Sequence, residues 1–160
     1  MEYFIASEEL IKHWAQACPN LSFIKFWVTR IVLPSSVVSC KAWQALANTH
    51  PNLLVEIHAQ LIESTRQMLP ILVTAMPVHT LKWDAWNEGT LEIDLKCLLH
   101  RVACYHRTIK ILFVDVAGEF PNLDNFSVQK ILANCKKLLP FFCYKTENDI
   151  RKASWKLAQK

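Results

Sequence analysis

The most constraining feature of this sequence is a unit that recurs along the chain: a short helical pattern followed directly by a short apolar strand pattern. The stretches "CPNLSFIKF" (18–26) and "HPNLLVEI" (50–57) both place Pro-Asn-Leu between the two patterns. When the first apolar residue of each strand pattern is taken as an anchor, the anchors fall at 21, 53, 78, 109 and 138, which are 25 to 32 residues apart. Recurrence at this spacing predicts a repeat architecture of about five irregular units.

The strand patterns follow L-x-x-L-x-L, which is the strand signature of leucine-rich repeats. In the second unit, an anchor at Leu53 would put Glu56 and His58 in apolar positions, so we favour a shift by one residue to Leu54. The expected inward residues are then Leu21, Ile24 and Phe26; Leu54, Ile57 and Ala59; Val78, Leu81 and Trp83; Ile109, Leu112 and Val114; and Leu138, Phe141 and Cys143.

Short amphipathic helices are expected before most of these strands, because apolar residues recur there at helical spacing. Ser7 and Ser39 are the expected N-caps of the first two helices. Further helical patterns cover 91–106 and 124–137. The segment 63–76 is the exception, since Pro70 would break or kink a helix there.

One helix–strand unit cannot bury its apolar face alone, but stacked units can bury one another's faces. Right-handed crossovers would then put the strands side by side in one parallel sheet, with the helices on the outer, convex side. We therefore predict an α/β leucine-rich-repeat solenoid, a partial horseshoe, over residues 1–145. The segment 146–160 has an apolar stripe at helical spacing, and we predict a C-terminal capping helix there that covers the open end of the stack.

The bulk composition excludes several classes of function. Apolar residues make up 52% of the 160 residues, so a packed core is expected rather than disorder. The net charge of +4 comes from scattered Lys and Arg without a basic stripe, so no nucleic-acid partner is predicted. No apolar run is long enough to span a membrane, and the acidic start "MEYFIASEEL" is unlike a signal peptide. We expect a cytoplasmic or nuclear protein with reduced cysteines.

The sequence resembles the F-box and leucine-rich-repeat protein family. The motif "CPNLSFIKF" is similar to that family's cysteine-containing repeat, in which a Cys stands three residues before the first Leu. The order of a Trp-bearing helix, "HPNL-VEI", "MPVHTLKW" and "ILANCKKLLPF" is similar as well, over roughly residues 8–144. Unit by unit, the place of the cysteine is taken by Cys18, His50, Ala75, His106 and Cys135.

The resemblance implies the substrate-recruiting part of an F-box subunit of a cullin-RING ubiquitin ligase of the SCF type. In that family an N-terminal F-box docks on the cullin adaptor, and the repeats hold the protein to be ubiquitinated. Because the resemblance covers the repeats only, the cullin adaptor is an expected partner only if a longer form carries an F-box. A repeat scaffold without a ligase connection, or a partial product, is the alternative.

Strand side chains that point away from the helices are expected to line the concave face, because successive side chains of a strand alternate between its two faces. Aromatic side chains carry much of the energy of protein interfaces, so a face that combines them with Lys and Asp favours a protein partner. We expect this partner to contact Phe23, Lys25, Trp27, Lys82, Asp84, Phe113, Asp115, Phe142 and Tyr144.

An alternative of another class depends on Cys97, His100 and Cys104, which share one helical face at spacing i, i+3, i+7. Three such ligands and a water could hold zinc, and a small metalloprotein or enzyme would follow. No fourth ligand stands at motif spacing, and the three positions coincide with the expected apolar stripe, so we favour packing in the core. No catalytic motif is found, and we predict a non-enzymatic protein without a cofactor or metal.

Overall fold

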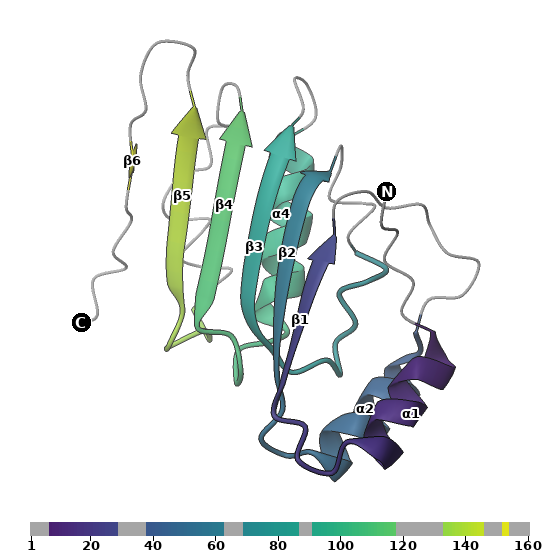
Figure 1. Cartoon of the computed structure of the whole chain (residues 1–160). Coiled ribbons are helices and arrows are strands. Elements are labelled where there is room, and N and C mark those ends of the chain that lie inside the picture. The colour runs from purple at the N-terminus through teal and green to yellow at the C-terminus, as the bar shows by residue number, and fades with distance from the viewer. Residues whose placement is uncertain are drawn as a thin grey trace.

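Figure 1 shows the computed structural model of the chain, which describes residues 7–28, 38–62, 69–86, 91–117, 133–145 and 152–153. Helix α1 precedes β1, α2 precedes β2, and α4 stands between β3 and β4. The helices are α1 (Glu8–Ala17), α2 (Cys40–Thr49) and α4 (Leu91–Ala103). The strands are β1 (Phe23–Val28), β2 (Leu54–Ile62), β3 (Val78–Trp86), β4 (Ile111–Ala117), β5 (Leu139–Lys145) and β6 (Lys152–Ala153).

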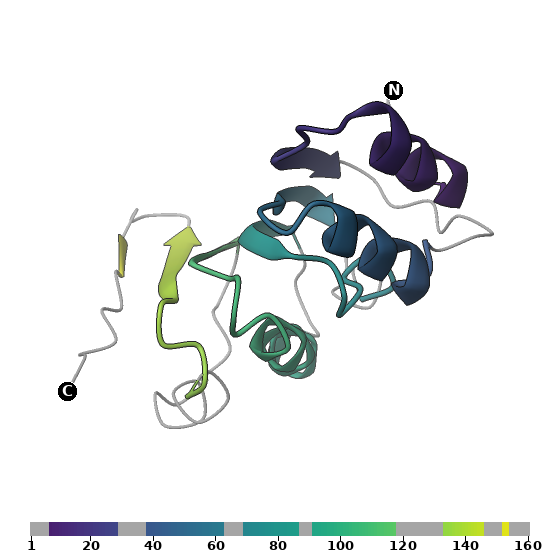
Figure 2. The ribbon, with the colours of Figure 1, turned by 90° about the horizontal axis from the view of Figure 1, so that it is seen from below.

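The strands form one sheet, in which their order in space equals their order along the chain. Neighbours from β1 to β5 pair in parallel, while β6 pairs antiparallel with β5. Helices α1, α2 and α4 lie on one side of the sheet (Figure 2), and no helix of the described residues covers the other side, which we call the helix-free face. The predicted α/β architecture with a parallel sheet is confirmed.

Helices α1 and α2 begin at the predicted N-caps. The hydroxyl of Ser7 accepts a hydrogen bond from the backbone N–H of Leu10 (3.2 Å), and the hydroxyl of Ser39 accepts one from Ala42 (3.2 Å). Each cap gives a partner to one of the backbone donors that a helix leaves unpaired at its N-terminus. Between β2 and β3, the described residues 69–77 form turns and bends rather than a helix, which agrees with the expected effect of Pro70.

One hydrogen-bonded turn recurs where the chain enters a strand. In three units, the backbone N–H of the anchor leucine donates to the carbonyl three residues earlier. In the fourth unit, Thr108 and Ile109 both donate to Tyr105 at 2.9 Å, and this tyrosine is buried while His106 is exposed. Tyr105 therefore takes the place expected for His106. The bonds of the other units, at 3.0 Å each, join Leu21 to Cys18, Leu53 to His50 and Leu138 to Cys135.

The core lies between the sheet and the helices, and it corrects one detail of the predicted pattern. In the second unit Leu53 is buried and Leu54 is 37% exposed, so the shift of the anchor to Leu54 is wrong. Strand β2 follows plain two-residue alternation from Leu53 onward, which is the ordinary period of a strand. Predicted inward residues found buried are Ile24, Phe26, Ile57, Ala59, Val78, Leu81, Trp83, Ile109, Leu112, Val114 and Leu138, and Leu21 is partly buried.

Two predicted helices fall largely outside the described residues. The helical pattern of 124–137 is described only from residue 133, and the described part forms turns. Of the predicted capping helix at 146–160, only Lys152–Ala153 are described. These two residues form strand β6 instead of a helix, because they pair with β5.

Candidate functional site

Strand β1 presents three side chains on the helix-free face. Phe23 is 49% exposed and Trp27 is 53% exposed, and the exposed Lys25 stands between them. The alternate residues of the strand are buried. Leu54 is the register partner of Phe23 and is also exposed, so the apolar surface continues from β1 onto β2. A group of large exposed apolar side chains, unlike a single one, is typical of an interaction site.

The parallel register brings residues of four strands into one row on this face. His58 lies opposite Trp27 on one side and opposite Lys82 on the other. Lys82 in turn lies opposite Phe113 in β4. Residues that lie opposite each other in a parallel pair project from the same face of the sheet. Lys82 and Phe113, both partly exposed, thus share the helix-free face with Trp27.

Glu56, in β2, connects three side chains of this face. Its Oε1 atom lies 3.5 Å from Nζ of Lys25 and 3.7 Å from Nζ of Lys82, and it also contacts Nε2 of His58. The two lysines come from the strands on either side of β2, so one carboxylate links three strands. The side chain of Glu56 is 17% exposed, whereas those of Lys25 and Lys82 are 36% and 43% exposed. Both ammonium groups therefore remain accessible to a partner.

The surroundings lower the pKa of both Glu56 and His58. Burial raises the pKa of the Glu56 carboxyl, but the hydrogen bond with His58 and the positive charges of His58 and Lys25 outweigh it. Burial lowers the pKa of His58 by more than Glu56 raises it, and Lys82 and Lys25 lower it further. A lowered pKa leaves His58 neutral at pH 7. At that pH we therefore attribute the lowered pKa of Glu56 to the hydrogen bond with His58 and to the positive charge of Lys25. The cluster then holds two positive charges and one negative charge.

Trp27 is exposed but held in place by two contacts. The centroid of its ring lies 4.4 Å from that of the His58 ring, in an edge-on arrangement. Nζ of Lys25 lies 4.8 Å from the centroid of the Trp27 ring, which is within the distance of about 6 Å over which an indole attracts a cation. A side chain that is already oriented loses little conformational entropy when a partner covers it.

A small hollow of about 120 Å³ adjoins this cluster. His58, Gln60, Lys82, Asp84 and Phe113 are among its lining residues, so polar and apolar groups meet there. Pockets for small organic ligands usually measure about 300–1,000 Å³. The hollow is therefore of a size for one side chain of a partner rather than for a cofactor.

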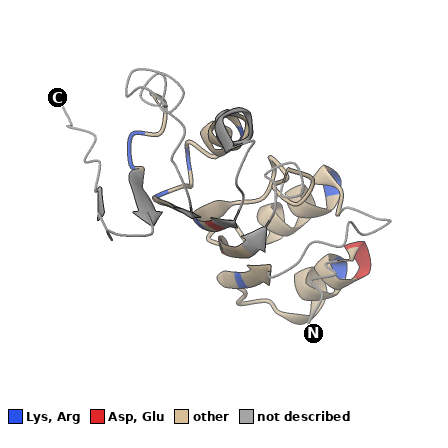
Figure 3. Ribbon diagram, turned by 90° about the horizontal axis from the view of Figure 1, so that it is seen from above, with Lys and Arg blue, Asp and Glu red and all other residues tan. Residues whose placement is uncertain are grey.

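Asp84 and Asp115 lie one row further toward the carboxyl ends of the strands. The register puts these two acidic residues directly opposite each other on β3 and β4, and Asp84 is partly exposed. The helix-free face therefore changes from Lys25 and Lys82 in the middle to Asp84 toward the carboxyl end of β3, where Asp115 is the backbone register partner. Over the rest of the described ribbon, Lys and Arg are scattered rather than gathered in one stripe (Figure 3).

The register corrects the predicted phase of β5. Phe142 pairs with Val114, which is buried on the helix side of the sheet. Phe141 is the residue that pairs with Phe113. Phe142, and with it Tyr144 two residues later, thus falls in the backbone row of the helix side, not in the row predicted for it. The register of β5 with β4 therefore corresponds to plain alternation from Leu138 rather than to the predicted L-x-x-L spacing.

The sequence interpretation also missed Leu54, Glu56 and His58 as residues of the helix-free face. The shifted anchor leaves β2 without a predicted residue there, although all three lie opposite residues of β1 that are exposed. Part of the signal is present in the sequence, because apolar and polar residues alternate strictly from Val55 to Ala59.

The three candidate zinc ligands do not form a site. Cys97, His100 and Cys104 are exposed on α4 and the turn after it, while Leu98 and Leu99 are buried. The expectation that the three belong to the apolar stripe is therefore wrong, since they lie on the outer side of the helix. Among the residues that the structure describes, no three His, Cys, Asp or Glu side chains are grouped so that they could hold a metal ion.

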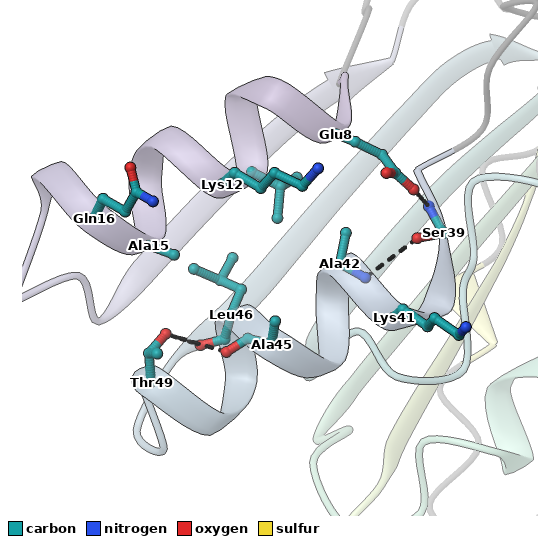
Figure 4. A pocket seen from close by; sticks show the side chains of 11 residues that line it. Glu8, Lys12, Ala15, Gln16, Ser39, Lys41, Ala42, Ala45, Leu46 and Thr49 are labelled. Carbon is teal, nitrogen blue, oxygen red and sulfur yellow. Dashed lines mark hydrogen bonds between the residues drawn. The ribbon is translucent and has the colours of Figure 1, made fainter.

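A second hollow, of about 520 Å³, lies between α1 and α2 (Figure 4). Oε1 of Glu8 accepts a hydrogen bond from the backbone N–H of Ser39 (3.1 Å), which joins the first turn of α1 to the N-cap of α2. Hydrogen bonds with Ser39 lower the pKa of the Glu8 carboxyl. Ala42 and Leu46 lie on the side of α2 that faces the hollow, and Lys12 lies across from them on α1 (Figure 4). This hollow follows from the stacking of two neighbouring helices.

Comparison with known proteins adds no assignment. No protein-family model, no curated protein and no solved structure matches the chain. Within the described residues, no helix combines the length and the apolar character that a membrane crossing requires.

Proposed function

We propose that the chain is a protein-binding module of the leucine-rich-repeat solenoid type, and that the helix-free face of its sheet contacts the partner. The parallel sheet in chain order and the turn that recurs before β1, β2 and β5 support this repeat architecture. The observation that carries the binding role is the exposure of Phe23 and Trp27, at about half of each side chain, on a face without a described helix.

Phe23, Trp27 and Leu54 leave apolar surface in contact with water on the helix-free face. Covering apolar surface is worth about 25 cal/mol per Å², and aromatic anchors dominate the energy of many interfaces. The cluster around Glu56 adds polar groups beside these anchors, and such groups fix the orientation of a partner. An apolar centre with charged groups next to it is the composition expected of a protein-binding surface.

We further propose that the bound protein is a substrate for ubiquitination, as the resemblance to F-box and leucine-rich-repeat proteins implies. This step depends on an F-box that docks on the cullin adaptor. Co-purification of the longest natural form with the adaptor tests it, and failure to bind favours a repeat scaffold without a ligase connection. The protein-binding role itself does not depend on the outcome.

A library of random twelve-residue peptides, displayed on phage and selected against the folded chain, tests the binding role. We expect enriched peptides whose binding is lost when Phe23 and Trp27 are both replaced by Ser. The matched control replaces Lys12 and Lys41, at the hollow between α1 and α2, by Ser and keeps binding. Enriched peptides that ignore the β1 substitutions, or a selection without enrichment, would count against the helix-free face as the binding surface.

A further inference from the structure

We infer that the helix-free face selects an acidic peptide segment, in which an Asp or Glu carboxylate contacts Lys25 and Lys82 while an apolar side chain two residues away covers Trp27. The inference rests on the proposed function and specifies the chemistry of the partner. The charges of the face, the positions of the two lysines and the neighbouring aromatic ring support it.

The charge of the cluster is unbalanced. Lys25 and Lys82 share the single carboxylate of Glu56, at 3.5 Å and 3.7 Å from the same oxygen atom. An ammonium group has three N–H donors, so each lysine keeps donors that Glu56 does not use. With His58 neutral, the four side chains Lys25, Glu56, His58 and Lys82 carry one positive charge in excess, which one carboxylate from a partner would balance within this group.

The two lysines are also placed for a shared ligand. They stand on β1 and β3, and both reach over β2 to the same atom of Glu56, so their ammonium groups converge. Their side chains are 36% and 43% exposed, which leaves them within reach of a partner. In such a position a partner carboxylate exchanges contacts with water for contacts with two cations at once.

The aromatic ring beside the lysines adds a second requirement. Trp27 is two residues from Lys25 on the same strand, so the two side chains are neighbours on one face. Side chains two residues apart in an extended peptide are about 6.5–7 Å apart and point to the same side. An extended partner with an apolar residue at position i and an acid at i+2 therefore matches Trp27 and the lysines together.

The same charges disfavour other partners. A basic residue at the centre would add positive charge next to Lys25 and Lys82, where like charges repel. Asp84 stands two residues from Lys82 on the same strand and lines the same hollow, so a partner segment that continued acidic in that direction would meet repulsion. The face thus favours one acidic position with non-acidic residues toward the carboxyl ends of β3 and β4.

Three synthetic nine-residue peptides test the inference. Each has Leu at position 4 and Ser or Gly elsewhere, and they differ at position 6, which is Glu, Gln or Lys. Surface plasmon resonance with immobilised peptide and the folded chain in solution measures each affinity. We expect the Glu peptide to bind roughly threefold to tenfold more tightly than the Gln peptide, with the Lys peptide weakest. The difference should shrink when ionic strength rises from about 0.05 M to about 0.5 M, because salt screens exposed charges.

Charge reversal supplies the matched variants. Lys25→Glu combined with Lys82→Glu should reverse the order, so that the Lys peptide binds best. Lys12→Glu combined with Lys41→Glu makes the same change of net charge on the helix side and should leave the order unchanged. Circular dichroism and thermal unfolding of each variant establish that it is folded before its affinities are compared.

The outcomes separate the two proposals. Equal binding of the Glu and Gln peptides, no binding by any of the three peptides, or no change on reversal of Lys25 and Lys82 overturns the inference. If library peptides still depend on Phe23 and Trp27 in that case, the proposed protein-binding role stands without acidic selection. If they do not depend on these residues, both proposals fail.

Discussion

The imidazole of His50 reaches from the second helix-to-strand turn back to the first, where its Nε2 atom lies 2.9 Å from the carbonyl oxygen of Cys18. Its Nδ1 atom lies 2.8 Å from the hydroxyl of Thr49. A carbonyl can only accept, so the Nε2–H group of His50 donates to Cys18. The Thr49 hydroxyl beside Nδ1 also donates to the carbonyl oxygen of Leu46 at 3.0 Å, which ties the ring to the end of α2. His50 is 6% exposed, and the contacts are made largely away from water. One buried side chain thus joins neighbouring units of the stack.

Replacing His50 by Ala should destabilise the chain. The substitution removes these hydrogen bonds and leaves unfilled space at a buried position, so we expect the free energy of unfolding to fall by about 2 kcal/mol. Urea unfolding followed by circular dichroism measures the change. His106→Ala, at an exposed position of the fourth turn, is the control and should stay within about 0.5 kcal/mol of the parent. Equal effects of the two substitutions would argue against the role of His50.

Trp83 offers a test of a buried donor. Its Nε1 is buried and has no hydrogen-bond partner among the described residues, and an unpaired buried donor costs about 1–3 kcal/mol. Trp83→Phe removes this donor together with some volume, so the two effects oppose each other and the net change should be below about 1 kcal/mol. Trp83→Ala, which only empties the site, should cost about 3–5 kcal/mol. Thermal unfolding of both variants measures the difference, and similar losses for the two would contradict the unpaired donor.

Glu8 should slow hydrogen exchange at the backbone amide of Ser39, the N-cap of α2. Its carboxylate accepts the N–H of Ser39, so Glu8→Ala is expected to speed the exchange of that amide. Glu9→Ala removes an acidic residue from the same first turn of α1, where it has the same favourable effect on the helix dipole, and is the matched control. Residue-resolved hydrogen exchange by NMR measures both. Unchanged exchange at Ser39 in the Glu8 variant would show that the contact is not held in solution.

Acidification should lower the stability of the fold. Burial lowers the pKa of His58 and of His79 below the ordinary value of 6.5. The unfolded chain then binds more protons than the folded chain as the pH falls from about 6.5 toward the folded pKa values, so the free energy of unfolding decreases over that window. Glu8 and Glu56, whose pKa values lie below the ordinary 4.5, add a further decrease at lower pH.

Urea unfolding between pH 8 and pH 5 measures this dependence. The double variant His58→Gln and His79→Gln should have a flatter profile over the upper part of the range, because it lacks the two groups that take up protons on unfolding. The control His13→Gln, at an exposed position, should keep the profile of the parent. A parent whose stability is constant down to pH 5 would contradict the burial of His58 and His79.

Much of the architecture could be predicted from the sequence, because the signals that determine it are local. Ser7 and Ser39 stand directly before helical patterns, and both act as caps. The parallel order of the strands follows from similar units that recur along the chain. These features depend on the nearest residues and on the period of apolar side chains, which a single sequence displays.

The candidate site was harder to predict, because its residues depend on the spacing that each strand follows. The inward residues can follow the L-x-x-L-x-L spacing or a plain two-residue alternation that starts at the anchor. Strands β1, β3 and β4 fit the L-x-x-L spacing, in which the second inward residue stands three positions after the anchor. Their residues Lys25, Lys82 and Phe113 accordingly lie on the helix-free face, as predicted. Strand β2 and the register of β5 follow plain alternation, so the predicted binding face omits Glu56 and includes Phe142, which pairs in the other row. A shift by one residue exchanges the two faces of a strand, and no local signal reports the register of the neighbouring strand.

The ladder between β2 and β3 contains two such shifts, and the first lies near the start of β2. Val55 lies opposite Val78, yet the next residue of β2, Glu56, lies opposite Thr80. An unshifted ladder would set Leu81 opposite His58 and Lys82 opposite the buried Ala59. The side chains that a binding partner contacts thus depend on the register of β2 and β3, and therefore on the length of the segment that connects them, as well as on the residues of the strands. A homologue with the same strand residues but a connection one residue longer or shorter could present an aliphatic side chain beside His58 in place of the ammonium group of Lys82.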